Sequence, residues 1–327
     1  MSTEFLALCT QNTIQHKSLT HLTQSRSSRN LWAMKVIRAK SAGFCWGVER
    51  AIEIAREYTS QGRSPVYTDG PLIHNTQMMD RLHSEGIREV GDYQSTATLT
   101  VNGDSDNGGV MVVRAHGISP ERRKYLKSLG LDFRDATCPD VGIIAGKIRL
   151  YARKGYSTVI FGDPAHPEII GLLGYTEGHG YCISNAADID ALPPLGEQVV
   201  MVSQSTMFTD EFQTLSLYLR ESYPTAVIID TICSATKDRQ GDIQVLVKQG
   251  SEALVIIGGH HSANTKKLAL LAQRTGLPTY HIETARDIDP LKMRTHRTVG
   301  VTAGASTPEF LISEVCQQLE AIEPLPC

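Results

Sequence analysis

Short apolar runs alternate with amphipathic stretches along most of the chain, and this alternation limits the folds open to it more than any other feature. Eight runs have the length of buried strands: KVIRA, VYTDG, VMVVRA, TVIFG, VVMVS, AVIID, ALVIIGG and TVGVTAG. Several end in a small or polar cluster that a helical pattern follows, as where Ser119 and Pro120 open SPERRKYLKSLG. Buried strands that alternate with helices are typical of parallel sheets, so we predict an α/β fold.

Length and composition narrow the class of protein. The chain has 327 residues, of which 41% are apolar and 20% charged, with a net charge of −3. This is typical of a soluble globular protein with two or three domains. No apolar run approaches the roughly 18 residues that a membrane helix needs. No long Lys/Arg block is present, so we expect no nucleic acid and no membrane as partner, and any phosphate ligand must be bound by local donors.

Three of the seven cysteines are regularly spaced. Cys45, Cys138 and Cys233 lie 93 and 95 residues apart, each after a strand or extended segment and before a probable helix. This predicts three similar α/β units that each deliver one thiol at the ends of their strands, where open sheets place ligands. The other cysteines, interpreted as core or tail residues, are Cys9, Cys182, Cys316 and Cys327. The seven cysteines together are odd in number and widely scattered, which indicates a reducing compartment.

Three converging thiolates favour an iron–sulfur cluster over zinc. Structural zinc normally has four ligands at C-x₂₋₄-C spacing, which this chain lacks. A cubane cluster held by three cysteines leaves one iron open for catalysis. Two alternatives stay open from the residues alone: buried, inert thiols, and a zinc- or thiol-dependent hydrolase that uses Cys45 or Cys138 with a nearby histidine.

Histidines and hydroxyls recur where strands end. His74, His116, His166 and the pair His260 and His261 all stand in turn contexts, which predicts a donor-rich pocket suited to phosphate oxygens. Glu168 stands at a predicted helix start, where a carboxylate also favours the helix dipole. The segments SQST, SANT and GAST are plausible helix caps. Ser306 or Thr307 is predicted to cap the last helix, with Pro308 in its first turn.

Taken together, these motifs resemble those of the 4-hydroxy-3-methylbut-2-enyl diphosphate reductase family. The motifs are AGFCWGV, GPLIHN, VRAHG, DATCP, HPE, TIC with RQ, and TAGASTPE, and they run in order from Met34 to Ile322. The resemblance implies three α/β domains in a pseudo-threefold cloverleaf around a central 4Fe–4S cluster. It also implies the last step of the methylerythritol phosphate route to isoprenoids, the reductive dehydroxylation of an allylic diphosphate to isopentenyl and dimethylallyl diphosphate.

The resemblance also assigns residues. It implies that Cys45, Cys138 and Cys233 hold the cluster, with one iron open, and that Glu168 delivers protons. The diphosphate pocket falls on six residues: His74, His116, His166, Ser262, Asn264 and Ser306.

Two positions depart from the family pattern. Ser205 stands where the family places a threonine near the substrate alcohol, so the hydroxyl is kept and the methyl lost, and Thr206 follows it. The usual N-S-S-N reads H-S-A-N here, with His261 and Ala263 replacing an Asn and a Ser. One phosphate donor is thus lost, and His261 is the candidate to compensate. A non-catalytic iron–sulfur sensor with a decayed pocket is the remaining alternative.

The source of electrons is predicted to be another protein. Neither G-x-G-x-x-G nor G-x-x-x-x-G-K-[ST] is present, so no nucleotide site is indicated. The resemblance implies a ferredoxin or flavodoxin as donor.

The segment before Met34 has a different composition. Residues 1–33 contain ten Ser or Thr, with Glu4 as the only acid, and no hydrophobic core of a secretory signal. We interpret them as a disordered tail or as sequence upstream of a true start at Met34. We expect a cytoplasmic protein, or a plastid one if residues 1–33 are a transit peptide. The predicted domains are 34–138, whose initial strand (34–45) packs on the third domain, then 139–231 and 232–322, with 323–327 as a tail.

Overall fold

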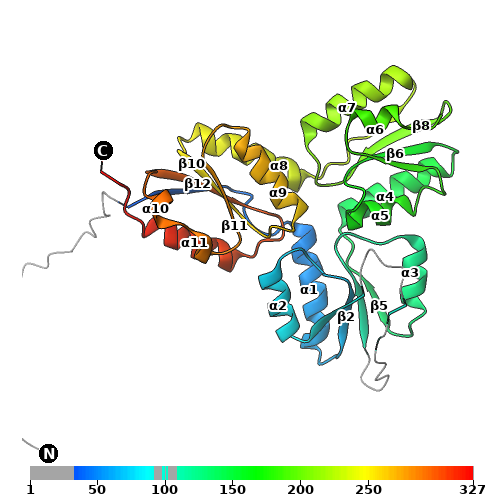
Figure 1. Cartoon of the computed structure of the whole chain (residues 1–327). Coiled ribbons are helices and arrows are strands. Elements are labelled where there is room, and N and C mark those ends of the chain that lie inside the picture. Colours follow the sequence, from blue (N-terminus) through cyan, green and yellow to red (C-terminus); the bar gives the residue numbers. More distant parts are fainter. Residues whose placement is uncertain (1–32, 92–97, 100, 102–108, 327) are drawn as a thin grey trace, which may run out of the picture. The chain divides into compact units, whose positions relative to one another are not determined.

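The computed structural model describes residues 33–91, 98–99, 101 and 109–326 (Figure 1). The predictions for residues 1–32, Cys9 and Cys327 lie outside these ranges. The first part of the chain forms β1 (Lys35–Arg38), α1 (Trp46–Ser60), β2 (Val66–Asp69), α2 (Thr76–Ser84), β3 (Ile87–Val90), β4 (Val110–Val113), α3 (Pro120–Lys127) and β5 (Asp132–Asp135). The middle part forms α4 (Pro139–Ala152), β6 (Ser157–Phe161), α5 (Pro167–Leu173), β7 (Gly180–Ile183), α6 (Ala186–Asp190), β8 (Val199–Ser203), α7 (Thr209–Ser222) and β9 (Val227–Ile228). The last part forms α8 (Ser234–Lys248), β10 (Ala253–Ile257), α9 (Ala263–Gln273), β11 (Thr279–Ile282), the 3₁₀ helix η2 (Ala285–Asp287), α10 (Pro290–Met293), β12 (Thr298–Ala303) and α11 (Glu309–Glu320).

The strands form three parallel sheets of four strands each, which confirms the predicted α/β class. The first sheet has the order β3-β2-β4-β5, the second β7-β6-β8-β9, and the third β1-β12-β10-β11. The third sheet begins with the first strand of the chain, because β1 pairs with β12 from Lys35 opposite Thr298 to Arg38 opposite Val301. The predicted domain boundaries themselves stay a prediction.

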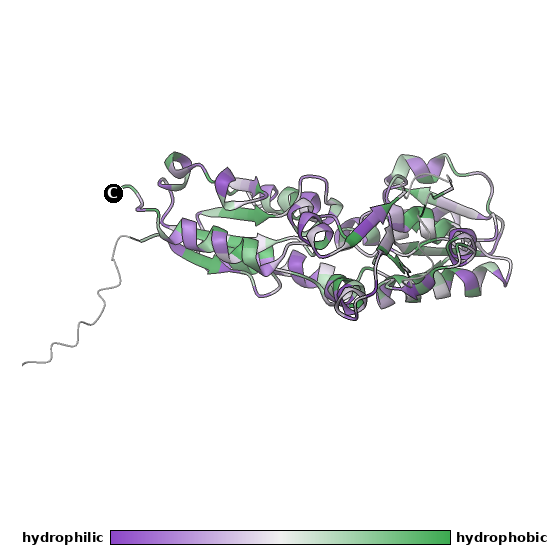
Figure 2. Ribbon diagram, turned by 90° about the horizontal axis from the view of Figure 1, so that it is seen from below, coloured by the Kyte–Doolittle hydropathy of each residue, from purple (hydrophilic) through white to green (hydrophobic). Residues whose placement is uncertain are grey.

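Both faces of the sheets are covered, which explains why their central strands are apolar without alternation. In β4, Val110 and Val112 pack with α1 and α2, whereas Met111 and Val113 pack on the side of α3. The second sheet repeats this arrangement, with α6 and α7 on one face and α4 and α5 on the other. Figure 2 shows the result as largely green strands next to helices that carry both colours.

Four strands were not predicted from the sequence, namely β3, β5, β7 and β11. Each lies at the edge of its sheet. Their sequences, IREV, DFRD, GYCI and TYHI, are partly exposed, so no continuous apolar run marks them.

The chain passes from one sheet to the next at three points, and a cysteine stands at each. Cys45 follows β1 of the third sheet and precedes α1, which packs on the first. Cys138 follows β5 of the first sheet and precedes α4, which packs on the second. Cys233 follows β9 of the second sheet and precedes α8, which packs on the third. The three thiols therefore mark the places where the sheets are joined.

Within the described ranges, every helix is too short or too polar to span a bilayer.

Candidate active site

The residues singled out in the sequence meet at one cavity of about 290 Å³. Its walls come from the carboxyl ends of the central strands and from the helices that follow. It is lined by all twelve predicted site residues: Cys45, His74, His116, Cys138, His166, Glu168, Ser205, Thr206, Cys233, Ser262, Asn264 and Ser306. The sequence therefore identified which side chains share a site.

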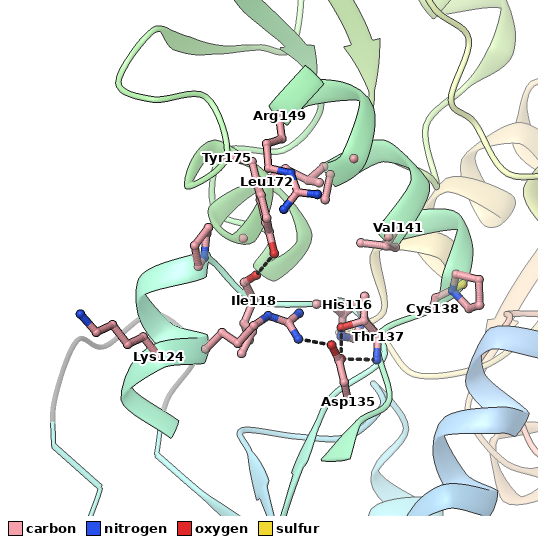
Figure 3. A pocket seen from close by; sticks show the side chains of 18 of the residues that line it. His116, Ile118, Lys124, Asp135, Thr137, Cys138, Val141, Arg149, Leu172 and Tyr175 are labelled. Atoms are coloured by element: carbon pink, nitrogen blue, oxygen red, sulfur yellow. Dashed lines mark hydrogen bonds and ion pairs between the residues drawn. The ribbon is translucent and has the colours of Figure 1, made fainter. Parts of the chain in front are cut away.

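Each of the three cysteines is the residue that caps the N-terminus of a helix, and none of the three thiols makes a capping hydrogen bond. The thiols thus face the positive ends of α1, α4 and α8, which favours thiolate. Figure 3 shows Cys138 at the start of α4. Gly47, in the first turn of α1, packs on this thiol, since a Cβ there would lie 2.5 Å from Cys138 Sγ.

Burial opposes ionisation of two of the thiols, those of Cys138 and Cys233. It raises the pKa of Cys138 to about 11, although backbone N–H groups of Asp140 and Val141 act in the other direction. Burial also raises the pKa of Cys233, whose Sγ lies 3.2 Å from Thr236 Oγ1. Three half-buried free thiols at helix N-termini fit a cationic metal cluster, because metal binding replaces the proton and balances the thiolate charge.

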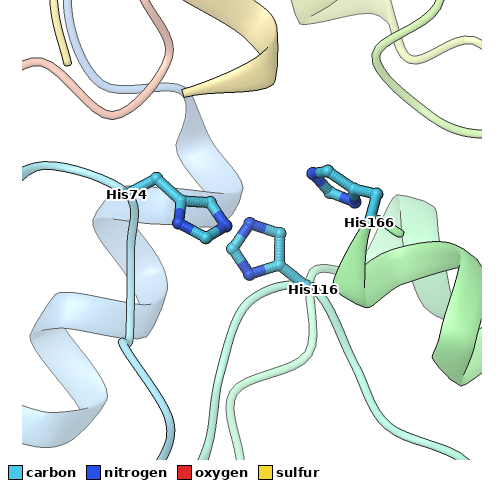
Figure 4. A group of neighbouring side chains, drawn as sticks. All are labelled: His74, His116 and His166. Carbon is cyan, nitrogen blue, oxygen red and sulfur yellow. The ribbon is translucent and has the colours of Figure 1, made fainter. Parts of the chain in front are cut away.

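Three histidines form the second part of the site. His74 and His116 have ring centroids 4.6 Å apart, and His166 lies 5.4 Å from His116 and 6.1 Å from His74 (Figure 4). One ring nitrogen from each lies within 4.8 Å of the others, so the triad can hold an anion through N–H groups or a metal ion through lone pairs.

Burial favours the neutral form of all three imidazoles. Burial lowers the pKa of His74 to about 4 and that of His166 to about 3, and it lowers the pKa of His116 well below its ordinary value. His166 Nδ1 accepts a hydrogen bond from the N–H of Glu168 at 3.2 Å, so its proton lies on Nε2.

Two buried polar atoms at the cavity lack a hydrogen-bond partner among the described residues. They are His116 Nδ1 and Asn264 Nδ2. Because a buried polar atom without a partner is costly, such atoms indicate a ligand that completes them. Both can donate to the oxygens of an anion.

The hydroxyls around the triad differ in what they contact. Ser262 caps α9 as predicted, accepting from Thr265 N at 3.3 Å. The predicted cap of α11 is wrong, because α11 starts at Glu309 with Pro308 as its capping residue. Ser306 Oγ instead donates to His74 O at 3.1 Å, and Thr307 Oγ1 donates to Ile257 O at 3.0 Å. SQST is not a cap either, since α7 starts only at Thr209.

Glu168 is the most buried acid of the site, with 2% of its surface exposed. Its carboxylate accepts from the N–H and the hydroxyl of Ser205, both at 2.7 Å. Burial raises its pKa, and the two hydrogen bonds from Ser205 only partly oppose this. Thr206 lines the same wall and accepts from Gln204 Nε2 at 3.2 Å. A protonated carboxyl next to a hydroxyl can pass a proton into the cavity.

The departures from the family motifs have different structural consequences. Ser205 keeps a hydroxyl in contact with Glu168. Ala263 lines the cavity with a methyl group, whereas His261 is exposed and is absent from the lining.

Sequence reasoning missed two cations beside the site, of which Arg239 is buried and Lys267 is half-buried. Arg239 is 3% exposed and donates to Gly43 O and Ala235 O, both at 2.7 Å, and it interacts electrostatically with Cys45 and Cys233. The RQ motif was the available signal for it. Burial lowers the pKa of Lys267 to about 8, and its charge acts on Glu168 and His166. No motif had marked this residue.

Comparison with known proteins gives concordant results. The family model described as LytB protein matches residues 36–320. The chain is 70% identical over 290 residues to the 4-hydroxy-3-methylbut-2-enyl diphosphate reductase of Opitutus terrae, covering 88% of this chain and all of that one. It is 36% identical to the Aquifex aeolicus protein of the same name, and the match covers 88% of this chain and 96% of that one.

Two solved structures are similar as well. The reductase structure from Plasmodium falciparum has a TM-score of 0.78 at 27% identity, with 87% of each chain covered. A second structure, titled as the terminal enzyme of the non-mevalonate pathway, has a TM-score of 0.65 at 34% identity, covering 88% of this chain and all of the other.

Proposed function

The chain belongs to the LytB family, and we propose that the 290 Å³ cavity is where it carries out the reaction of the 4-hydroxy-3-methylbut-2-enyl diphosphate reductases. The protein is an oxidoreductase of the non-mevalonate isoprenoid pathway. It removes the hydroxyl of an allylic C5 diphosphate reductively and yields isopentenyl and dimethylallyl diphosphate. The substrate takes up two electrons and two protons, a C–O bond breaks, a C–H bond forms, and one water leaves.

The family binds an iron–sulfur cluster, and we infer that Cys45, Cys138 and Cys233 hold it here as a 4Fe–4S cluster with one iron left open. One observation carries this inference: three thiols without capping hydrogen bonds stand at three helix N-termini around one cavity. When bound, such a cluster supplies single electrons and a Lewis-acidic iron.

The diphosphate end of the substrate is proposed to bind at His74, His116, His166, Ser262, Asn264 and Ser306. The unpartnered His116 Nδ1 and Asn264 Nδ2 support this role, since both can donate to phosphate oxygens. An adjacent anion also raises an imidazole's pKa, so the neutral triad can become cationic as substrate enters. Binding energy at this end then positions the C–O bond at the reacting end.

Protons are proposed to come from Glu168. Burial raises the pKa of this carboxyl and so favours its protonated form, which general-acid catalysis requires because hydroxide is a poor leaving group. The Ser205 hydroxyl is in contact with this carboxyl at 2.7 Å and, with Thr206, relays the proton toward the substrate oxygen.

The electron donor is proposed to be a ferredoxin or a flavodoxin, because no nucleotide motif is present in the sequence. We also propose that this protein is cytoplasmic, which its scattered, free cysteines support.

Anaerobic reconstitution tests this proposal. The purified chain is loaded with iron and sulfide, both are quantified, and 4-hydroxy-3-methylbut-2-enyl diphosphate is added with a viologen reduced by dithionite. We expect about four irons per chain and both C5 products.

Serine variants give the matched controls. Replacing Cys45, Cys138 or Cys233 should abolish cluster assembly, whereas Cys182→Ser, on β7 away from the cavity, should retain it. Full iron content in Cys138→Ser would contradict the three-ligand assignment. Near-normal turnover of a loaded Glu168→Gln variant would contradict the proton-donor role.

A further inference from the structure

A second and larger cavity, of about 810 Å³, is an open groove beside the site. Residues of α1, α3, α4 and α5 line it, together with the segments that precede α3 and α4. Figure 3 shows Lys124 on α3 and Arg149 on α4 on two sides of it. The proposed reaction does not use this groove.

The groove is strongly basic in an acidic chain. Six cations line it, namely Arg50, Arg123, Lys124, Lys127, Arg149 and Arg153, against a single carboxylate, Asp135, among the described residues. Asp135 is already paired with Arg123. The net charge of the whole chain is −3. A concave surface of one sign concentrates the field and attracts partners of the opposite sign.

Most of these cations are available to a partner. Lys124, Arg149 and Arg153 are exposed, and the described part of the chain offers none of the three an ion pair. Lys127 lies over the Phe133 ring at 5.2 Å. The charge of the groove is therefore not neutralised within the fold.

The face of α4 that lines the groove allows close approach. Gly142, Ala145 and Gly146 form its first half, and a Cβ at either glycine would meet nothing within 4 Å. Glycine inside a helix costs about 1 kcal/mol relative to alanine, so two of them at open positions suit contact with another surface. Ile143 and Leu150, on a neighbouring face of α4, are 56% and 52% exposed and offer apolar contact beside the charges.

The groove reaches the residues proposed to hold the cluster. Cys138, His116 and Val141 line both the groove and the 290 Å³ cavity. A protein seated in the groove would thus lie next to Cys138 without entering the substrate cavity. This is the requirement for a one-electron donor, which must come close to the cluster while substrate is bound.

We propose that this groove is the docking site for a small acidic electron-carrier protein, which rests on the function proposed above. Each docking event transfers one electron, so two reduced carriers are oxidised per substrate converted, while the substrate takes up two protons and releases water. Carboxylates on the carrier pair with Lys124, Lys127, Arg149 and Arg153. Such electron-transfer contacts are small and weak, and charge governs their association rate.

Charge reversal tests the docking site by binding as well as by activity. The groove variant carries Lys124→Glu with Arg149→Glu. The control variant carries Arg220→Glu with Lys248→Glu, an equal change of charge near the ends of α7 and α8, outside the groove lining. The probe is an oxidised, acidic ferredoxin, titrated by calorimetry into each loaded protein at low and at moderate salt.

We expect the dissociation constant of the groove variant to rise by roughly tenfold or more, and its salt dependence to flatten. The control variant should bind as the unmodified chain does. Turnover with reduced ferredoxin should fall in parallel, whereas turnover with reduced viologen should persist, which also establishes that the variant is folded and loaded.

Equal ferredoxin affinity in the groove and control variants would overturn the proposal. It would also be overturned if the groove variant kept its ferredoxin affinity and lost affinity for a short RNA duplex, since the groove would then be a nucleic-acid surface. Absence of viologen-driven turnover in the unmodified chain would instead contradict the proposed function, and the ferredoxin titration would still decide the docking site.

Discussion

At the scale of single residues, Glu168 is placed where its protonated form is favoured. Its carboxyl is almost fully buried, and its hydrogen-bond donors among the described residues come from Ser205 alone. Burial raises its pKa above the ordinary value of 4.5. Between that value and the raised one, the folded chain binds more protons at this position than the unfolded chain does. Ionised Glu168 therefore destabilises the fold as pH rises through this window.

The first prediction follows from this loss of stability with rising pH. Glu168→Gln has no ionisation to lose, so the metal-free variant should gain stability relative to the unmodified chain between about pH 5 and pH 8. Each tenfold difference in proton affinity corresponds to about 1.4 kcal/mol. Urea unfolding at both pH values measures this. If the difference in unfolding free energy between Glu168→Gln and the unmodified chain were the same at both pH values, Glu168 would ionise normally in the fold.

The histidine triad gives a second prediction at the same scale. Without a bound anion, the pKa values of His74 and His166 are about 4 and about 3, and a bound diphosphate should raise both. At a pH between the pKa of the free protein and the higher pKa of the complex, diphosphate binding should therefore take up protons. The affinity for diphosphate should fall as pH rises through this range.

Calorimetry of inorganic diphosphate in two buffers of different ionisation enthalpy measures this uptake. His166→Gln serves as the comparison, since it keeps an amide donor and removes the titrating ring. Equal proton uptake by both proteins would exclude His166 as a site of protonation.

Single-residue contacts also explain where sequence reasoning failed. Ser306 and Thr307 look like helix caps because they stand just before a proline and an amphipathic run. Their hydroxyls instead donate to His74 O and Ile257 O, which lie 232 and 50 residues away. Contacts between distant segments carry no local pattern. In contrast, Ser262 caps its own helix, and its local motif predicted this correctly.

At the scale of elements, the spacing of the cysteines follows from how the sheets are joined. Each thiol stands between an edge strand of one sheet and a helix of the next. The sequence could reveal this arrangement because strand, cysteine and helix follow one another closely. It could not reveal four of the edge strands, β3, β5, β7 and β11, because their partly exposed sequences form no continuous apolar run.

The third prediction concerns the start of α1. Alanine normally stabilises a helix by about 1 kcal/mol relative to glycine. At Gly47, however, the added Cβ would lie 2.5 Å from Cys138 Sγ and force that thiol to turn away. Gly47→Ala should therefore lose most of its bound iron while remaining folded, as iron analysis and circular dichroism would measure.

Gly241→Ala is the matched control for this variant. Gly241 lies inside α8, and a Cβ there meets nothing within 4 Å. This variant should keep its iron and gain up to about 1 kcal/mol of stability. Normal iron content in Gly47→Ala would show that the starts of α1 and α4 are not tightly packed against each other.

At the scale of the whole molecule, the three cysteines proposed to hold the cluster stand at the three points where the sheets are joined. A ligand that binds only the folded chain stabilises it, by about 2.7 kcal/mol at a hundredfold excess over its dissociation constant. The fourth prediction is that removing iron with a chelator lowers the thermal midpoint of the whole chain, and that Cys182→Ser responds as the unmodified chain does. An equal midpoint with and without iron would mean that the cluster does not bridge these points.

The basic groove belongs to this scale too, and it was not predicted from the sequence. Its cations come from α1, α3 and from the segment around α4, each contributing one to three. Arg123, Lys124 and Lys127 are neighbours in the sequence, but only the fold brings them together with the cations of α1 and α4.

The pairing of β1 with β12 has a consequence for the order of events on the ribosome. Lys35 and its neighbours are made early, yet their partner strand begins only at Thr298. At about 5 to 20 residues per second, the first strand waits roughly 13 to 50 s for its partner. During this time β2, β4 and β5 are complete and can pair. The growing chain can therefore complete its first sheet, on which α1 packs, while β1 still lacks its partner strand, so β1 is made early and takes its place in a sheet late.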